Sequence, residues 1–300
     1  MGWRSIMVEN AAHISVRQAQ LLIEGEQNIS LPLEDLNIVL IESRQVQLSS
    51  AALSAMAREG VALMVCDDRH LPCGVLLPYA QHSRSLAVAR LQVQASEARK
   101  KRLWQQIVKT KIANQACCLR LRGLQKDAAA LDALGRAVSS GDAGNMEAIA
   151  AAAYFRALFG PDFTRGQENG INAVLNYGYA LLRALTARTL AVYGFLACFG
   201  LCHRSELNPF NLTDDMMEPL RPVVDLYAAQ HASEDMILSP QEKRKLFSLL
   251  GQSMLSGGQR HAISSAVERS VQSLVRALQL AGQPSLMLPE LLQPQQHSYE

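Results

Sequence analysis

Histidine and carboxylate side chains are grouped in one short part of the sequence, between residues 202 and 222. His203 follows a strongly apolar run, and Asp214, Asp215 and Glu218 come after a polar loop. If this acidic segment is helical, Asp215 and Glu218 lie about 60° apart on it, because each residue turns a helix by about 100°. Carboxylate oxygens together with one imidazole nitrogen are ligands that suit Mg²⁺ or Mn²⁺.

The same residues also have an interpretation that needs no metal. Thr213 can cap the N-terminus of the acidic helix, and the helix dipole favours acidic residues in a first turn. A histidine at the C-terminus of the preceding helix is favoured for the same electrostatic reason. The spacing alone leaves both interpretations open.

Glu147 is a second candidate for chemistry. It is the only acidic residue in an Ala-rich helix that we expect to end at Phe159-Gly160. A carboxylate in such an apolar setting should be paired, capped or coordinating. The alternative is that Asp142 caps this helix and Glu147 lies on its exposed side.

Basic residues are concentrated between residues 81 and 126. This stretch holds eleven Lys and Arg residues and one acidic residue, a net charge of +10, whereas the whole chain is at +2. We expect a helix here with Leu103, Ile107 and Val108 facing inward, so that its cations can follow DNA phosphates. The cations we assign to DNA binding on this helix are Arg99, Lys100, Lys101, Arg102 and Lys109. The alternative is an ordinary solvated face.

Several functional classes lack support in the sequence. There is no G-x-x-x-x-G-K-[ST] motif for nucleotide phosphates, no G-x-G-x-x-G, no G-x-S-x-G and no C-x-x-C pair. The six cysteines resemble reduced, mostly buried thiols, and no secretory signal is visible, so we expect a cytoplasmic protein. The longest apolar run, Leu190 to Cys202, is too short to span a membrane comfortably and predicts a buried helix.

The pattern of apolar residues along the chain changes near Pro78. Before it, short β-branched stretches separated by turn formers predict strands, and a helix over Ala51–Arg58, capped by Ser49 or Ser50, makes a strand–helix–strand crossover and a mixed sheet. After it, apolar residues recur at helical spacing. The fold class is therefore α+β, a small N-terminal β-rich domain followed by a large all-α domain. We place these at residues 1–79 and 80–288, with a flexible Pro- and Gln-rich tail over 289–300.

An ordered set of motifs then resembles the CRISPR-associated spacer-acquisition integrase family, over essentially the whole chain. The form of the last motif is similar to the branch encoded beside the single-protein, RNA-guided effector nuclease (type II). The motifs are Leu103-Trp104-Gln105-Gln106-Ile107-Val108-Lys109-x-Lys111-Ile112-x-Asn114-Gln115, Gly141-Asp142-x-x-Asn145-x-Glu147-Ala148, Ala152-x-Tyr154-Phe155, Phe163-x-Arg165, Asn172-x-x-Leu175-Asn176-Tyr177-Gly178-Tyr179, and His203-Arg204-Ser205-x-x-Asn208-x-Phe210-Asn211-Leu212-x-Asp214-Asp215-x-x-Glu218-Pro219-x-Arg221-Pro222.

The resemblance implies an N-terminal domain used in homodimerisation and a helical domain that holds Mg²⁺ or Mn²⁺. By motif, the catalytic and metal-binding residues are Glu147, His203 and Glu218, with Asp215 as a neighbouring metal ligand. Many branches of the family carry Asp at the last position, so Glu218 departs in length but not in charge. Whether His203 is a ligand or a general acid/base stays open.

The implied reaction is a phosphodiester transesterification. The 3′-hydroxyl of a double-stranded prespacer attacks a boundary of the CRISPR repeat, and the basic residues, together with Arg165, contact the DNA backbone. The implied assembly joins two homodimers to a dimer of a small ferredoxin-like CRISPR-associated partner in a 4:2 complex, with the effector nuclease as a further candidate partner. Two alternatives remain: a metal-dependent DNA endonuclease that integrates nothing, and a non-catalytic DNA-binding scaffold.

Overall fold

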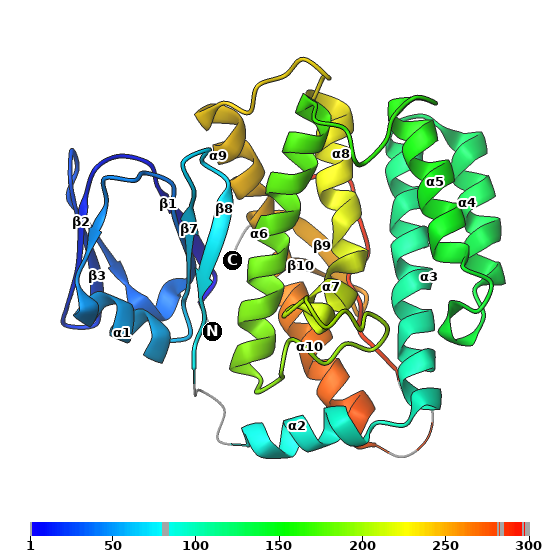
Figure 1. Ribbon diagram of the computed structural model, residues 1–300, viewed down its shortest axis with the longest axis horizontal. Helices are drawn as coiled ribbons and strands as arrows, with labels where there is room; N and C mark the ends of the chain where they lie inside the picture. Colours follow the sequence, from blue (N-terminus) through cyan, green and yellow to red (C-terminus); the bar gives the residue numbers. More distant parts are fainter. Residues whose placement is uncertain (1, 80–83, 281, 283–284, 296, 298–300) are drawn as a thin grey trace.

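A computed structural model describes residues 2–79, 84–280, 282, 285–295 and 297. It shows a β-rich N-terminal part beside a larger, mainly helical part (Figure 1). This confirms the predicted α+β fold class. The helical part is not purely α, however, because β9 (Ser253–Ser256) and β10 (Gln259–Ala262) pair as an antiparallel hairpin within it. The predicted division at 79/80 falls beside residues 80–83, which lie outside the described residues.

The N-terminal part consists of two four-stranded sheets. One sheet has the order β1-β5-β7-β8, in which the first three strands are parallel and β8 is antiparallel, and the other has the order β4-β3-β2-β6. The elements are β1 (Arg4–Val8), β2 (His13–Arg17), β3 (Gln20–Glu24), β4 (Ile29–Pro32), β5 (Leu36–Ile41), β6 (Gln47–Leu48), α1 (Ser50–Arg58), β7 (Ala62–Cys66) and β8 (Pro72–Leu76). The predicted crossover β5-α1-β7 and its mixed sheet are confirmed, and Ser49 caps α1 by accepting a hydrogen bond from Ala52 N.

Strand β5 links two hydrophobic cores. All six of its residues are buried, as expected for a strand covered on both faces. Successive side chains point to opposite faces of a sheet. Ile38 and Leu40 therefore belong to the core of the helical part, whereas Val39 and Ile41 belong to the core between the two sheets. The β-rich part thus packs directly against the helical part, where β7 and β8 contact α6 (Gly170–Val192).

The helical part is built around α6, whose residues are buried on nearly every side of the helix. In Figure 1 α6 lies in the middle, with β8 on one side and α8 and α3 on the other. The helices are α2 (Ser85–Gln94), α3 (Glu97–Leu121), α4 (Gln125–Ala137), α5 (Met146–Phe159), α6 (Gly170–Val192), α7 (Asn211–Met217), α8 (Arg221–His231), α9 (Pro240–Ser248) and α10 (Ile263–Gln279), with 3₁₀ turns η1 (Leu33–Asp35), η2 (Ser140–Asp142), η3 (Glu218–Leu220) and η4 (Leu249–Gly251). None of the described helices is both long and apolar enough to cross a membrane.

Two local predictions near the acidic segment were wrong. The apolar run from Leu190 to Cys202 is not one helix, because α6 ends at Val192 and a loop follows. Gly194 has a φ of +78°, a conformation that suits glycine and not a continuing helix. Thr213 does not cap α7 either; it lies inside the helix, fully buried.

The expected flexible tail is ordered over its described residues. Leu291 is buried, and its amide donates to Asn114 Oδ1 of α3 at 2.9 Å. Glu290 pairs with Leu255 of β9, and Ser253 N donates to the carbonyl of Gln295. The Pro- and Gln-rich composition suggested a loose segment, but two leucines and the edge of the hairpin give residues 288–295 a place to pack.

Candidate active site

Helix α3 is the element on which the candidate site is built. Leu103 and Ile107 face the core as predicted. Trp104 and Lys111 lie seven residues apart, which brings them to nearly the same side of a helix with 3.6 residues per turn. Trp104 contacts the ring of His203 edge-on, with the ring centroids 5.7 Å apart. The same side of α3 therefore reaches both candidate regions.

Two of the predicted site residues, Glu147 and Glu218, meet at the ammonium group of Lys111. Lys111 Nζ lies 2.5 Å from Glu218 Oε2 and also pairs with Glu147 Oε1. Burial alone would lower the pKa of Lys111, but the charges of the two glutamates outweigh it and raise the pKa above its ordinary value. The structure thus brings two carboxylates from distant elements onto one positive charge.

Glu147 is positioned by the start of α5. Asp142 accepts hydrogen bonds from the amides of Met146 and Glu147, both at 2.9 Å, and so satisfies two free donors of the first turn. The alternative interpretation of this helix is therefore right about the cap. It is wrong about exposure, since the side chain of Glu147 is only 27% exposed and pairs with Lys111.

Glu218 opens the 3₁₀ turn η3 and is almost fully buried. Burial opposes its ionisation, but the Lys111 ammonium and the Arg221 guanidinium lower its pKa to about 2. Arg221 Nε donates to Glu218 Oε1 at 2.8 Å. Asn114, three residues after Lys111 on α3, donates to the carbonyl of Pro219 at 2.7 Å and so fixes the backbone beside Glu218.

His203 and Asp215 form the second half of the candidate site. His203 lies in the loop between α6 and α7, and its Nδ1 is 2.6 Å from Asp215 Oδ1. The amides of Leu201 and Cys202 donate to Asp215 Oδ2, so this fully buried carboxylate shapes the loop as well as the imidazole. The hydrogen bond to Asp215 raises the pKa of His203, and the charge of Glu218 acts in the same direction.

The donor set fits a hard divalent cation. Glu147 and Glu218 already converge on one cation, the ammonium group of Lys111, which occupies the position that a metal ion would take. A metal-binding histidine usually donates its other ring N–H to a carboxylate, as His203 can to Asp215, which leaves Nε2 free to ligate. Among the described residues, no three His, Cys, Asp or Glu side chains are already grouped closely enough to hold a metal. The position that Glu147 and Glu218 share is filled by the ammonium.

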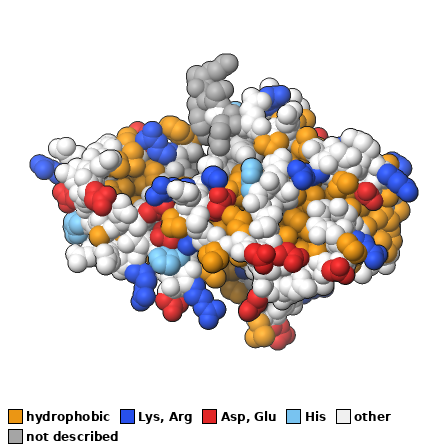
Figure 2. Space-filling view, turned by 90° about the horizontal axis from the view of Figure 1, so that it is seen from above, with side chains coloured by type: hydrophobic (Ala, Val, Ile, Leu, Met, Phe, Trp, Pro, Cys, Tyr) orange, Lys and Arg blue, Asp and Glu red, His pale blue; other side chains and the backbone are white. Residues whose placement is uncertain are grey.

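The basic residues of α3 have varied surroundings. Arg99 Nη1 donates to the carbonyls of Ala277 and Leu280, at 2.5 and 2.7 Å, and so holds the C-terminal end of α10. Lys100 pairs with Glu97 at 3.4 Å. Exposed side chains are found at Lys101, Arg102 and Lys109. On the face shown in Figure 2, lysines and arginines are interspersed with acidic residues and do not form one basic field.

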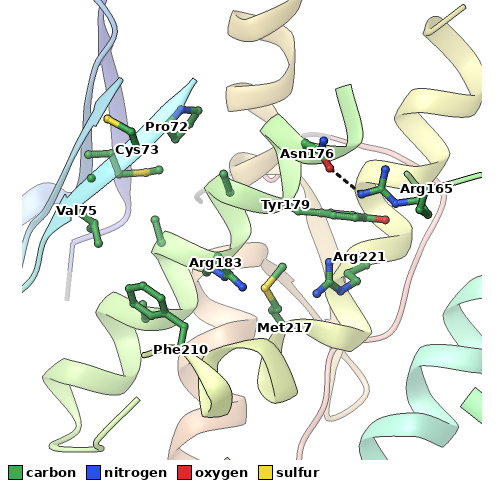
Figure 3. Close-up of a pocket in the computed structure, with 15 residues that line it drawn as sticks. Pro72, Cys73, Val75, Arg165, Asn176, Tyr179, Arg183, Phe210, Met217 and Arg221 are labelled. Carbon is green, nitrogen blue, oxygen red and sulfur yellow. Dashed lines mark hydrogen bonds between the residues drawn. The ribbon is translucent and has the colours of Figure 1, made fainter. Parts of the chain in front are cut away.

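Arg165 lies elsewhere, in a cavity of about 550 Å³ between β8 and the helices (Figure 3). Its guanidinium donates to Asn176 Oδ1 at 2.8 Å and lies over the ring of Tyr179. Arg183 and Arg221 line the same cavity. Because Arg221 also contacts Glu218, the cavity adjoins the carboxylate half of the site.

Two of these site residues, Lys111 and Arg221, had no role assigned from the sequence. Lys111 belongs to the basic stretch and to one family motif, but it falls four residues after Ile107 and eight after Leu103, on the inward side of the predicted helix. A lysine on an apolar helix face is the signal that could have identified it, since buried lysines are nearly always paired. Arg221 follows Glu218 by three residues, the spacing at which helical side chains are neighbours.

The buried carboxylate Asp225, behind the site on α8, should make stability depend on pH. Burial raises its pKa from 3.8 to about 6, and the hydroxyl of Tyr179 donates to it. As the pH rises from about 4 to 6, the unfolded chain loses this proton first, so the contribution of Asp225 to stability falls. We expect the free energy of unfolding of wild type, compared with that of Asp225→Asn at each pH, to fall by on the order of 2 kcal/mol between pH 4.5 and 7. Urea unfolding at a series of pH values measures this difference. A difference that stays constant over that range would contradict the expectation.

Several solved structures share the fold of this chain. A casposase bound to integration product superposes with a TM-score of 0.74 at 20% identity, covering 92% of this chain and 90% of that one. A Cas1 protein from Thermotoga maritima gives a TM-score of 0.71 at 16% identity, covering 92% and 97%. A Cas6-RT-Cas1–Cas2 complex also gives 0.71 at 18% identity, covering 96% of this chain and 36% of that one.

Sequence similarity gives the family. The pattern of the family described as CRISPR associated protein Cas1 matches residues 6–260. A CRISPR-associated endonuclease Cas1 from Neisseria meningitidis serogroup C is 44% identical over the full length of both chains, and a second from Pyrobaculum aerophilum is 27% identical over 91% of this chain and 98% of its own. This chain belongs to the Cas1 family, which confirms the resemblance found in the motifs.

Proposed function

We propose that this protein is a metal-dependent DNA integrase of CRISPR adaptation. The observation that carries the proposal is the convergence of Glu147 and Glu218 on one cation of α3, the helix whose Trp104 also contacts a histidine that a buried carboxylate orients. Membership of the Cas1 family, whose 44% identical member is named an endonuclease, supports an enzyme that acts on nucleic acid. The casposase whose fold it shares is bound to an integration product, which favours joining over cutting alone.

Glu147, Glu218 and His203 Nε2 would hold Mg²⁺ or Mn²⁺. When bound, the metal ion would lower the pKa of an attacking hydroxyl and offset negative charge on the phosphate. We assign Asp215 the role of orienting His203, since its oxygens accept hydrogen bonds from the loop amides and face the imidazole. Arg221 keeps Glu218 ionised and orients its carboxylate. It donates to Oε1, so that Oε2 faces the position that Glu147 and Glu218 share.

In the proposed reaction, the 3′-hydroxyl of a prespacer duplex attacks a phosphodiester at the repeat boundary. One P–O ester bond forms as another breaks, so no nucleotide hydrolysis is needed. The protein contributes by holding the reacting groups in line and by excluding alternative geometries. The exposed cations Lys101, Arg102 and Lys109, with Lys100, Arg99 and Arg165, are proposed to contact the DNA backbone.

We propose that the chain works as a homodimer formed through its N-terminal domain, residues 1–79, with catalysis in residues 80–288. Solved Cas1–Cas2 complexes that share its fold support a small CRISPR-associated partner, proposed to be ferredoxin-like and to bind two homodimers in a 4:2 assembly. The effector nuclease is a further proposed partner. We expect the reaction to take place in the cytoplasm, where the six free thiols stay reduced.

A strand-transfer assay tests this function. Labelled duplex with free 3′-hydroxyls would be incubated with a supercoiled plasmid that carries a repeat, the small partner protein, and Mg²⁺ or Mn²⁺. Wild type would be compared with His203→Ala, with His231→Ala, an exposed histidine at the C-terminal end of α8, as the matched control. We expect label to enter the plasmid with wild type and with the control, only when metal is present, and not with His203→Ala.

Two other results would favour the alternatives. Metal-dependent nicking of the plasmid without transfer of label would identify an endonuclease that does not integrate. DNA binding without nicking or transfer, unchanged in His203→Ala, would favour a non-catalytic scaffold.

A further inference from the structure

The proposed metal site does not by itself explain Lys111. Its side chain is only 9% exposed, and its ammonium lies between Glu147 and Glu218, the two carboxylates that would bind the metal. We propose that Lys111 is an internal counter-cation, which occupies the metal position when no metal is bound and competes with the divalent ion for both glutamates. This inference rests on the proposed metal site and adds a determinant of its affinity.

The contacts of Glu218 show which oxygen is contested. Arg221 donates to Oε1, whereas Oε2 is buried and pairs with Lys111 Nζ at 2.5 Å. Glu147 likewise turns Oε1 to the same ammonium. A divalent cation between these elements would need the same two oxygens, so the ammonium and the metal cannot both use them.

The backbone that carries Lys111 is held in place. Asn114, one turn further along α3, donates to the carbonyls of Pro219 and Pro289 and accepts from Leu291 N, all between 2.7 and 2.9 Å. The start of the Lys111 side chain therefore has a fixed position relative to Glu218. Only its four-carbon stem is free to move, and a lysine stem is flexible enough to carry the ammonium aside when a metal arrives.

The arrangement also has an energetic reason. Two carboxylates brought together in a partly buried site repel each other unless a positive charge lies between them. Lys111 supplies that charge and keeps α3, α5 and η3 together without metal. The cost is that a metal ion must displace the ammonium before both glutamates can bind it. The site therefore binds the metal more weakly than the same two carboxylates would without Lys111.

Mn²⁺ binding to the full-length protein without DNA tests the proposal, measured by isothermal titration calorimetry together with melting temperature. Lys111→Met keeps an unbranched side chain, one atom shorter, and removes its charge. We expect it to bind Mn²⁺ about tenfold more tightly than wild type, the order of effect of one close charge. It should also melt lower than wild type in EDTA and gain more from saturating Mn²⁺. Lys109→Met removes the same charge from the exposed side of α3 and should leave the affinity unchanged.

A folded Lys111→Met that binds Mn²⁺ no more tightly than wild type would overturn the proposal while leaving the metal site intact. If Lys111→Met does not fold, Lys111→Arg serves instead, because its guanidinium keeps the charge and should bind Mn²⁺ with wild-type affinity or more weakly. Tighter binding by Lys111→Arg would also overturn the proposal. If wild type and Lys111→Met both fold and both fail to bind Mn²⁺, the proposed metal site itself is wrong, and this inference fails with it.

Discussion

Asp215→Asn should reduce strand transfer by about 100-fold, although Asp215 is proposed to act through His203 and not on the DNA. The carboxylate accepts from the amides of Leu201 and Cys202 and lies 2.6 Å from His203 Nδ1. An asparagine has only one acceptor oxygen, so its amide NH₂ must face either the loop amides or the imidazole. In the first case the loop that carries His203 loses the acceptor of its two amides, and in the second His203 loses the acceptor that fixes its tautomer.

The measurement is the strand-transfer rate per folded molecule, together with Mn²⁺ affinity. Asp214→Asn is the matched control, since Asp214 is the next residue, is buried, and pairs with Arg183 and Asn208 instead of His203. Both variants should lose some stability, but only Asp215→Asn should also lose metal affinity. Equal losses of rate and affinity in the two variants would show that Asp215 has no specific role toward His203.

The sequence was sufficient for the broad architecture because that depends on local periodicity. The β-branched strands, the Ser49 cap and the inward face of α3 are each set by residues close together in the chain. The loop after Val192 was not predicted, since the apolar residues of 193–202 resemble a helix by composition. What decides the outcome is tertiary: this loop wraps around the buried carboxylate of Asp215, which takes its amides as hydrogen-bond donors.

The candidate site also combines features that local motifs predict with features that only tertiary contacts decide. The motifs indicated Glu147, His203 and Glu218, but spacing gives no information about which residues separated by 36 or more positions meet in space. The pairing of Lys111 with both glutamates joins three elements, and no local pattern records it. The packing of the C-terminal tail could not be predicted for a similar reason, because its partners, Asn114 and β9, lie far away in the sequence.

Another pair of distant residues leads to the largest expected effect on stability. Glu42, just after β5, pairs with Lys243 of α9 at 3.0 Å, and the two side chains are 8% and 6% exposed. Lys243 also lies over the ring of Tyr177, and Glu42 accepts a second contact from His70. This ion pair joins the β-rich part to the helical part.

Glu42→Gln should lower the free energy of unfolding by about 3 kcal/mol, because it leaves the Lys243 ammonium buried without a counter-charge. Equilibrium urea unfolding at pH 7 measures this. Glu9→Gln is the matched control: Glu9 pairs with Arg244, the neighbour of Lys243, but that arginine is 60% exposed, so its loss should cost less than about 1 kcal/mol.

The double variant Glu42→Gln/Lys243→Met separates the charge from the contact. If the cost of Glu42→Gln comes from an uncompensated ammonium, removing that ammonium should restore most of the lost stability, since buried ion pairs are often replaceable by apolar groups. A double variant as unstable as the single one would instead mean that the pair contributes attraction of its own. In both cases the measurement reports how strongly the β-rich part is held to the helical part that carries Glu147, His203 and Glu218.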